Sequence, residues 1–155
     1  MSAFCAGDGS LATPCPCGNT GGAGHGCANS ANAAGALLAW SGAPSPDTLV
    51  LLGSGMPAAV SCIYLQGDQS APAGVVFGDG VRCASGSLVR LRTKNNVAGA
   101  SRFPDSADAV TVSQRGGVVP GNGAVRFYPT CYRNAASAFR PPETFDVTNG
   151  LVVAW

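Results

Sequence analysis

Charge is scarce in this chain, and that scarcity excludes two classes of protein. Charged residues make up 11% of the 155 residues, against about 25% in an average domain, and the formal net charge is +1. A nucleic-acid-binding surface needs clustered Lys and Arg to replace the counterions of the phosphates, whereas the one lysine and eight arginines here are scattered. No apolar run approaches the roughly 20 residues of a membrane-spanning helix. We therefore expect no nucleic-acid partner and no membrane insertion.

Histidine is nearly absent, and this removes most catalytic arrangements. His25 is the only histidine, so a site with three histidines cannot form, and any Ser-His-Asp triad or Cys-His pair would have to use this residue. It stands between two glycines, which favours an ordinary loop residue. No serine occupies a Gly-x-Ser-x-Gly elbow. We therefore expect that the chain is not an enzyme; an enzyme with an unrecognised site ranks last among the alternatives.

Cysteine and glycine, in contrast, are concentrated near the start of the chain. Residues 15–30 contain three of the seven cysteines and five glycines, too little apolar volume to form a core. So many cysteines favour an oxidising compartment, and we expect a secreted, extracellular protein. Residues 1–35 then form a clasp held by two disulfides among four cysteines, with the pairing left open: Cys5, Cys15, Cys17 and Cys27.

Zinc is the alternative use of the same cysteines. Cys15, Cys17, His25 and Cys27 would make an acceptable tetrahedral set of three thiolates and one imidazole. The common zinc knuckles, however, place two residues between paired cysteines, and here Cys15 and Cys17 are separated by one. Bridged cysteines also fit the oxidising setting better.

From residue 36 the sequence alternates between short apolar runs and turns rich in Gly, Pro, Asn and Asp. Runs of this length with β-branched and aromatic residues are typical of strands. We expect strands at 36–40, 47–52, 60–66, 74–77, 81–83, 88–93, 109–113, 125–132, 145–147 and 151–155. No segment predicts a helix. The predicted fold is a single all-β domain in which 36–155 form an antiparallel, jelly-roll-like β-sandwich and the clasp packs against it.

Turn residues predict how some of these strands connect. Residues 36–52 should form two neighbouring strands, and Gly78-Asp79-Gly80 should close a hairpin. Thr148-Asn149-Gly150 carries the Asn-Gly signal of a second hairpin at the end of the chain. Pro129 lies inside the predicted strand 125–132 and indicates an edge or a bulge there. Residues 95–108 show little periodicity and are expected to be a long surface connection.

Several phrases together carry a family resemblance. They are Phe4-Cys5-Ala6-Gly7-Asp8-Gly9, Cys15-Pro16-Cys17-Gly18-Asn19, Gly26-Cys27-Ala28-Asn29-Ser30, Leu52-Gly53-Ser54-Gly55-Met56-Pro57, Val76-Phe77-Gly78-Asp79-Gly80-Val81-Arg82-Cys83, Tyr132-Arg133-Asn134-Ala135 and Thr148-Asn149-Gly150. Over nearly its whole length the chain resembles an uncharacterised family of secreted planctomycete-type bacterial domains, often found at the C-terminus of larger exported proteins. The resemblance implies no established activity.

The chain departs from the pattern of that family at three cysteine positions. The resemblance implies a cysteine where this chain has Arg140, and usually none at Cys62 and Cys131. The missing cysteine leaves the partner of Cys83 open. Two unusual cysteines appearing together are most simply explained as partners, so we predict a disulfide between Cys62 and Cys131, with Cys83 as the odd thiol.

Aromatic residues on the predicted strands supply the main binding hypothesis. Sugar-binding sandwiches use such rings as stacking platforms beside polar side chains, although each ring could equally fill the core. The candidate binding residues are Trp40, Tyr64, Tyr128, Tyr132, Arg90 and Arg92.

We expect no cofactor, with calcium as the alternative. Asp8, Asp79, Asp105 and Asp108 lie in predicted loops rich in carbonyl oxygens that suit this ion, although aspartate also forms turns in any β protein. The expected function is a non-catalytic extracellular accessory domain that binds a glycan or another cell-surface polymer. The alternative is a structural, assembly or sorting domain of a larger exported protein, in contact with a neighbouring domain or a second copy of itself.

Overall fold

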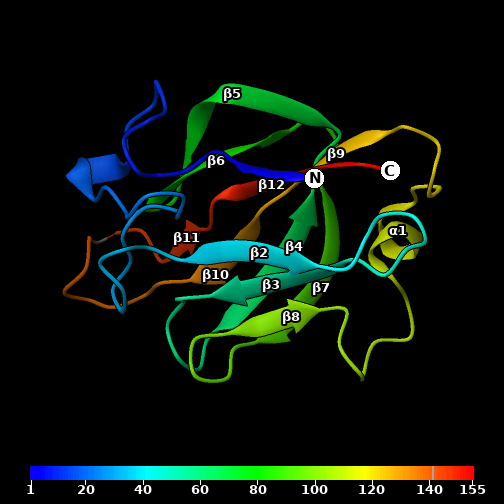
Figure 1. The fold of residues 1–155 in the computed structure, drawn as a ribbon. Helices are drawn as coiled ribbons and strands as arrows, with labels where there is room; N and C mark the ends of the chain where they lie inside the picture. The colour runs from blue at the N-terminus through cyan, green and yellow to red at the C-terminus, as the bar shows by residue number, and fades with distance from the viewer. Residues whose placement is uncertain (141) are drawn as a thin grey trace.

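The computed structural model describes residues 1–140 and 142–155, and this part of the chain is built almost entirely from antiparallel strands (Figure 1). The strands are β1 (Ser2–Phe4), β2 (Leu37–Ser41), β3 (Val50–Ser54), β4 (Ser61–Gln66), β5 (Gln69–Phe77), β6 (Gly80–Ser85), β7 (Val89–Asn95), β8 (Ser101–Phe103), β9 (Val125–Tyr128), β10 (Thr130–Arg133), β11 (Phe145–Val147) and β12 (Gly150–Ala154). A 3₁₀ turn, η1 (Pro16–Gly18), and a short helix, α1 (Val112–Gly116), complete the described elements. The predicted class, an all-β antiparallel sandwich, is confirmed.

The strands form four hydrogen-bonded groups. Their orders are β1-β12-β9, β11-β10-β4-β7, β2-β3-β8 and the pair β5-β6. Figure 1 shows the β2-β3-β8 sheet in front of β4 and β7. The core lies between these layers, because apolar residues of both meet there: Leu38, Leu51, Tyr64, Leu91, Phe103 and Tyr132 are all fully buried. Among the described residues no helix is long and apolar enough to cross a membrane.

Two of the predicted connections are confirmed. β2 pairs with β3, so the two runs between 36 and 54 are neighbours, and β5 pairs with β6 across Gly78-Asp79. Gly78 has a φ of +64°, which an L residue adopts only with strain. A Cβ at this position would also overlap the Phe145 carbonyl oxygen. The turn of this hairpin is therefore packed against β11 rather than projecting into solvent.

The predicted strand at 109–113 is wrong, because this segment starts helix α1. Thr111 is the N-cap: its hydroxyl accepts from the Gln114 backbone N–H, and the Gln114 side chain accepts from the Thr111 backbone N–H. This is a reciprocal capping box. Gly117 then ends the helix in the left-handed conformation, with a φ of +64°. Val110 and Val112 alternate with polar residues as in a strand. The segment is too short to distinguish the two-residue period of a strand from the 3.6-residue period of a helix.

The expected surface connection at 95–108 contains a further strand. β8 pairs with β3, with Leu51 opposite Phe103, and the Phe103 side chain is fully buried in the core. Three residues are too few to show a period, which is why the sequence did not reveal this strand.

Pro129 divides the run 125–132 more completely than expected. β9 pairs with β12, whereas β10 pairs with β4 and β11, so the chain changes sheets at the proline. Proline donates no ladder hydrogen bond, which suits a position between two sheets.

The predicted hairpin at Thr148-Asn149-Gly150 is also wrong. β11 pairs with β10 and β12 with β1 and β9, so the flanking strands belong to different sheets. Asn149 is fully buried, and its side-chain amide accepts from the Leu38 N–H at 2.7 Å and donates to the Leu38 carbonyl at 3.1 Å. The Asn149 side-chain amide thus makes the two hydrogen bonds that a neighbouring strand would make with Leu38 of β2. Asn149 takes part in this long-range contact and not in a hairpin turn.

The clasp contains one of its two predicted disulfides. Cys15 bonds Cys27 within the first 35 residues, whereas Cys5 bonds Cys83 on β6, so the prediction that Cys17 is bridged and Cys83 is free is wrong. β1 also pairs with β12 of the sandwich. The start of the chain is therefore joined to the sandwich by a strand pairing and by a covalent bond.

The predicted disulfide between Cys62 and Cys131 does not form, although the strands that carry these residues are neighbours. β4 pairs with β10 in a register that places Cys131 opposite Ile63 and Tyr132 opposite Cys62. Residues directly opposite each other share a face, and successive residues alternate between faces, so the two sulfurs lie on opposite sides of the sheet. Both cysteines are free.

Arg140 contacts the backbone of Cys17, the third free cysteine. Arg140 Nη1 donates to the Cys17 carbonyl oxygen at 2.8 Å, and Cys17 is exposed. The partner of Cys83, which the sequence left open, is Cys5.

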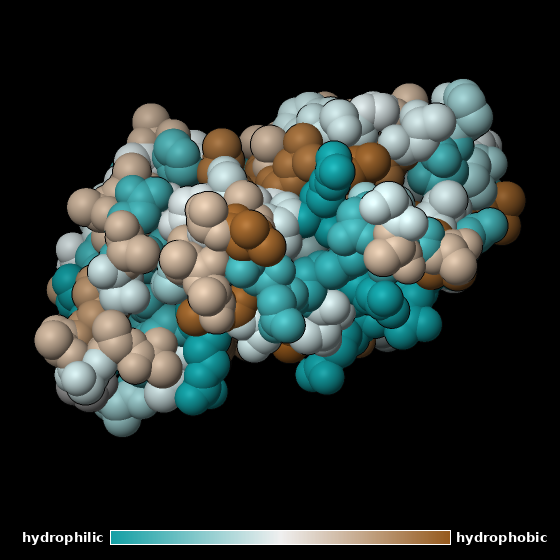
Figure 2. Space-filling view, turned by 90° about the horizontal axis from the view of Figure 1, so that it is seen from below, coloured by the Kyte–Doolittle hydropathy of each residue, from teal (hydrophilic) through white to brown (hydrophobic). Residues whose placement is uncertain are grey.

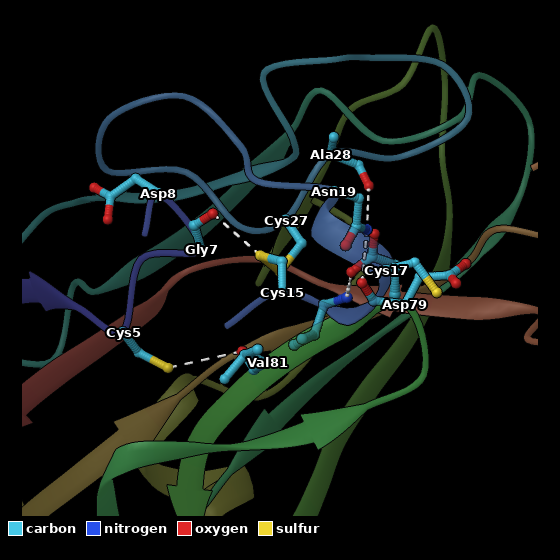
Figure 3. The surroundings of a disulfide bond; sticks show 12 residues. Cys5, Gly7, Asp8, Cys15, Cys17, Asn19, Cys27, Ala28, Asp79 and Val81 are labelled. Atoms are coloured by element: carbon cyan, nitrogen blue, oxygen red, sulfur yellow. Dashed lines mark hydrogen bonds between the residues drawn. A yellow bond between two sulfur atoms is a disulfide. The ribbon is translucent and has the colours of Figure 1, made fainter. Parts of the chain in front are cut away.

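Figure 3 shows the clasp over the turn of the β5-β6 hairpin, with the Cys15–Cys27 bond at its centre. The Asn19 amide donates to the carbonyls of Ala28 (2.9 Å) and Asp79 (2.8 Å) and so joins two parts of the clasp to the hairpin. At Gly26 the clasp passes so close to β11 that a Cβ would overlap the Val147 carbonyl oxygen. The clasp is held in place by close contacts between backbone segments and not by an apolar core.

We expect the Cys5–Cys83 bond to stabilise the fold more than the Cys15–Cys27 bond. The first spans 78 residues and the second 12, and in the chain-entropy model these loops correspond to about 4.5 and about 3 kcal/mol. Urea unfolding of the double variants Cys5→Ser/Cys83→Ser and Cys15→Ser/Cys27→Ser checks the order. Equal losses, or a larger loss for the second variant, would contradict it.

The three free cysteines should differ in reactivity. Cys17 is exposed, whereas burial raises the pKa of the Cys62 thiol and raises that of Cys131 to about 12. Since the thiolate is the reactive form, iodoacetamide should modify Cys17 alone in the folded protein and three thiols after denaturation without reductant. Peptide mass mapping checks both counts; modification of Cys83 in the denatured sample would contradict the assigned bonds.

Candidate functional site

A cavity of about 560 Å³ lies against β3, β8 and the end of β7. Its lining comes from β3, from the end of β7 with the turn after it, and from β8 with the loop after it: Leu52, Gly53, Ser54, Lys94, Asn95, Val97, Ala100, Ser101, Arg102 and Asp105. Figure 2 views the molecule from the side on which β8 lies in Figure 1, and hydrophilic and hydrophobic residues are mixed on this face. We refer to this space as the β8 cavity.

Ser101 connects the β8 cavity to the core. Its hydroxyl lies 2.9 Å from the Tyr64 hydroxyl and 3.0 Å from the Cys62 sulfur, both on β4. The Tyr64 hydroxyl also accepts from the Gly53 N–H at 3.3 Å. Burial raises the pKa of the Cys62 thiol and of the Tyr64 phenol, so both groups are protonated at neutral pH. Neither can serve as a general base for Ser101.

Two carboxylates and two cations form a compact network beside the same cavity. Lys94 Nζ lies 2.7 Å from Asp105 Oδ2 and 2.5 Å from Asp108 Oδ2, and Arg92 Nε lies 2.8 Å from Asp108 Oδ1. Burial lowers the pKa of Lys94, but the hydrogen bonds to Asp105 and Asp108 raise it more, so the net shift is upward. Lys94 is therefore a fixed cation and not a proton acceptor.

A second polar cluster lies beneath the clasp and away from the β8 cavity. The Asp79 carboxylate accepts from the Asn134 amide at 3.0 Å, and Asp146 Oδ1 accepts from the Val147 N–H at 2.6 Å. Asp146 is fully buried and its Oδ2 has no hydrogen-bond partner. Burial raises the pKa of Asp146 to about 8, and the nearby Asp79 charge raises it as well. A Cβ at Gly80 would overlap Asp146 Oδ1, so this carboxyl is packed directly against the β6 backbone.

The predicted aromatic binding residues lie mainly in the core. Tyr64, Tyr128 and Tyr132 are at most 1% exposed, so none offers a ring face to a ligand, and their prediction as a stacking platform is corrected. Their hydroxyls are hydrogen-bonded inside the protein, as buried phenols require: Tyr128 to Gln66 at 2.9 Å and Tyr132 to Asn29 at 3.1 Å.

The remaining three candidates lie in different places. Trp40 is half-buried and packs against the core. Arg90 is exposed on β7, and Arg92, on the same strand, pairs with Asp108 beside the β8 cavity. Of the six predicted binding residues, Tyr64 reaches the cavity wall from the core through its contacts with Ser101 and Gly53, and Arg92 lies beside the cavity through its ion pair with Asp108.

The structure affects the two predicted metal sites, zinc and calcium, differently. The zinc set loses two of its thiolates because Cys15 and Cys27 are bonded to each other. The four aspartates considered for calcium are dispersed: Asp8 accepts from the backbone N–H groups of Ser10 and Gly24, Asp79 is buried under the clasp, and the other two pair with Lys94. Across residues 1–140 and 142–155 no group of three or more His, Cys, Asp or Glu side chains could hold a metal ion. Calcium stays an untested prediction.

Sequence reasoning missed most residues of the β8 cavity. Lys94 is the only lysine of the chain, and this was the one signal that could have singled it out. Ser101 and Arg102 lie on a strand too short to recognise. The chain matches no known family model, no curated protein and no solved structure. The case for a function therefore depends on the geometry of the site itself.

The buried Asp146 should make stability fall as pH rises. Its pKa is about 8 in the folded protein against a usual 3.8, so between these values the folded state binds the extra proton. This group alone lowers the free energy of unfolding by up to about 1.4 kcal/mol per pH unit in that interval, and the effect levels off above pH 8. Asp146→Asn stays neutral, so its stability relative to the parent protein should increase from pH 4 to pH 8.

Urea unfolding at a series of pH values measures this difference. Asp8→Asn is the matched control, because hydrogen bonds from Gly24 and Ser10 lower the pKa of Asp8 and leave it ionised in both states above pH 5. A difference between Asp146→Asn and the parent protein that does not change with pH would show that Asp146 is ionised when folded.

Proposed function

We propose that this chain is a non-catalytic binding domain of an extracellular protein and that the β8 cavity binds a segment of a carbohydrate chain. The observation that carries the proposal is the cavity itself. Its volume of about 560 Å³ falls within the range of ordinary ligand clefts, roughly 300–1,000 Å³. Its wall combines apolar groups with hydrogen-bonding side chains.

The chemistry of the wall suits a sugar. Leu52, Val97 and Ala100 can contact the C–H faces of a pyranose ring, while the amide of Asn95 and the hydroxyl of Ser54 can bond ring hydroxyls. Asn95 and Ser54 are exposed, so they keep their hydrogen-bonding capacity for a ligand.

Two further observations support a non-catalytic role outside the cell. Ser101, a nucleophile-type side chain of the cavity, has only a protonated phenol and a protonated thiol as hydrogen-bond neighbours among the described residues. The two disulfides fit an oxidising compartment.

A role in assembly is the second candidate, and one observation favours it. Val75 and Val76 on β5 are 49% and 55% exposed, and β5 pairs only with β6. Thr13 of the clasp donates to the carbonyls of Ala73 and Gly74 on β5, but Val75 and Val76 stay exposed. Such an exposed apolar stretch is a ready surface for a neighbouring domain or a second copy. Sedimentation of the purified chain would distinguish this role, since it requires self-association or a partner, whereas glycan binding does not.

The test is direct binding of oligosaccharides. We expect a measurable affinity for at least one member of a panel of bacterial and plant cell-wall polysaccharides, by affinity electrophoresis and calorimetry. Replacing Asn95 by Ala should weaken it about 2- to 12-fold, the equivalent of one neutral hydrogen bond of 0.5–1.5 kcal/mol. Gln69→Ala, an exposed amide on β5, is the matched control and should leave binding unchanged. No binding across the panel would refute the proposal.

A further inference from the structure

We infer that the β8 cavity selects an anionic sugar, one that carries a carboxylate or a sulfate, over a neutral one. This inference rests on the proposed function, because it specifies the ligand of the same site. It follows from the polar groups at the cavity wall: donor hydrogens of the wall are left without a partner, while most carboxylate oxygens beside it already accept a hydrogen bond.

The first spare donor is the Ser101 hydroxyl. The Tyr64 hydroxyl accepts from the Gly53 N–H, so its own proton is free for Ser101 Oγ, which lies 2.9 Å away. The protonated Cys62 thiol, 3.0 Å from the same oxygen, has its proton available as well. A serine hydroxyl has two acceptor positions and one donor. Either atom can be the donor in each of these contacts; in the arrangement where Tyr64 and Cys62 donate, the Ser101 proton is left for the cavity, which Ser101 lines.

The second spare donor belongs to Lys94. An ammonium group has three donor hydrogens, and two of them are used by Asp105 and Asp108. Lys94 lines the cavity, so its third hydrogen is available there.

The carboxylates of the network, in contrast, offer little to a ligand. Asp105 Oδ2 accepts from Lys94 and its Oδ1 accepts from the Ala107 N–H at 2.9 Å. Asp108 Oδ2 accepts from Lys94 and from the Asp105 N–H, and the side chain is 1% exposed. The acceptors at the cavity are thus largely occupied before any ligand arrives.

The net charge at the cavity also favours an anionic ligand. The charges of Arg92 and Lys94 cancel those of Asp105 and Asp108, and Arg102 adds a positive charge with no ion-pair partner among the described residues. Ser101 and Arg102 are successive residues of β8 and point to opposite faces of the sheet. Both nevertheless line the cavity. A guanidinium at this position suits the planar oxygens of a carboxylate and the oxygens of a sulfate.

The experiment compares three oligosaccharides of equal length by calorimetry: an oligogalacturonate, a sulfated heparin fragment and a neutral cello-oligosaccharide. We expect at least one anionic probe to bind ten times or more tightly than the neutral one, with an affinity that falls as salt is added. Which anionic probe binds more tightly distinguishes carboxylate from sulfate recognition.

Two variants test the residues named. Arg102→Gln should weaken anionic binding about tenfold or more and reduce its salt dependence, since it removes the unbalanced charge. Ser101→Ala should weaken binding while leaving the salt dependence unchanged, because only a neutral donor is lost. Arg133→Gln is the control: this arginine is exposed on β10 and does not line the β8 cavity. Thermal unfolding of each variant separates lost binding from lost folding.

The outcomes separate the two levels of the argument. Binding of the neutral probe as tightly as the anionic ones, with Arg102→Gln unchanged, would overturn the anionic selectivity and leave the carbohydrate proposal in place. Anionic binding that Arg133→Gln weakens as much as Arg102→Gln would place recognition outside the cavity and overturn both proposals.

Discussion

The Cys5–Cys83 bond is the constraint on which the placement of the clasp depends. It fixes the end of β1 against β6, across 78 residues of chain, and so holds a glycine-rich segment with little apolar surface of its own. With that anchor in place, the short pairing of β1 with β12 and the close passage of Gly26 past β11 can form. Without a large core in this segment, covalent and backbone contacts must supply the order that side-chain packing supplies elsewhere.

The rest of the sandwich is unusual in how much polar chemistry it buries. Three tyrosines fill the core, yet each hydroxyl is hydrogen-bonded, and Asn149 pairs with the backbone of β2 in place of another strand. Such groups are costly if a partner is missing, so they favour one arrangement of the sheets over others that would leave them unsatisfied. Because the surface carries few charges, these buried hydrogen bonds are a large part of what selects this arrangement of the sheets.

The same polar core reaches the surface at the β8 cavity. Tyr64 and Cys62 belong to the core, and their contacts with the Ser101 hydroxyl hold this group at the wall of the cavity. Lys94 and its two carboxylates stiffen the neighbouring wall. A ligand that meets donors already fixed by the fold loses less freedom on binding than one that must order them. The proposed binding role is therefore linked to the fold through a few hydrogen bonds, not through an aromatic platform.

The sequence by itself determined the all-β class, the β2-β3 pairing and the hairpin at Gly78-Asp79, because alternation and turn residues are local signals. It also indicated that the strands of Cys62 and Cys131 are neighbours. The tertiary structure alone decided the register of these strands, and a shift of one residue moves a side chain to the other face of the sheet, so the two cysteines stay apart.

Long-range choices account for the other differences. Whether a tyrosine fills the core or lines the surface, and whether Cys5 bonds a near cysteine or Cys83, depends on which segments meet in space. The capping box at Thr111 was present as a local signal, but two alternating valines imitated a strand. The β8 cavity draws on residues 52–54, 94–97 and 100–105, three separate segments. No local sequence pattern predicts that these segments lie together, because the pairing of β3 with β8 and the packing of β7 beside them bring the segments into contact.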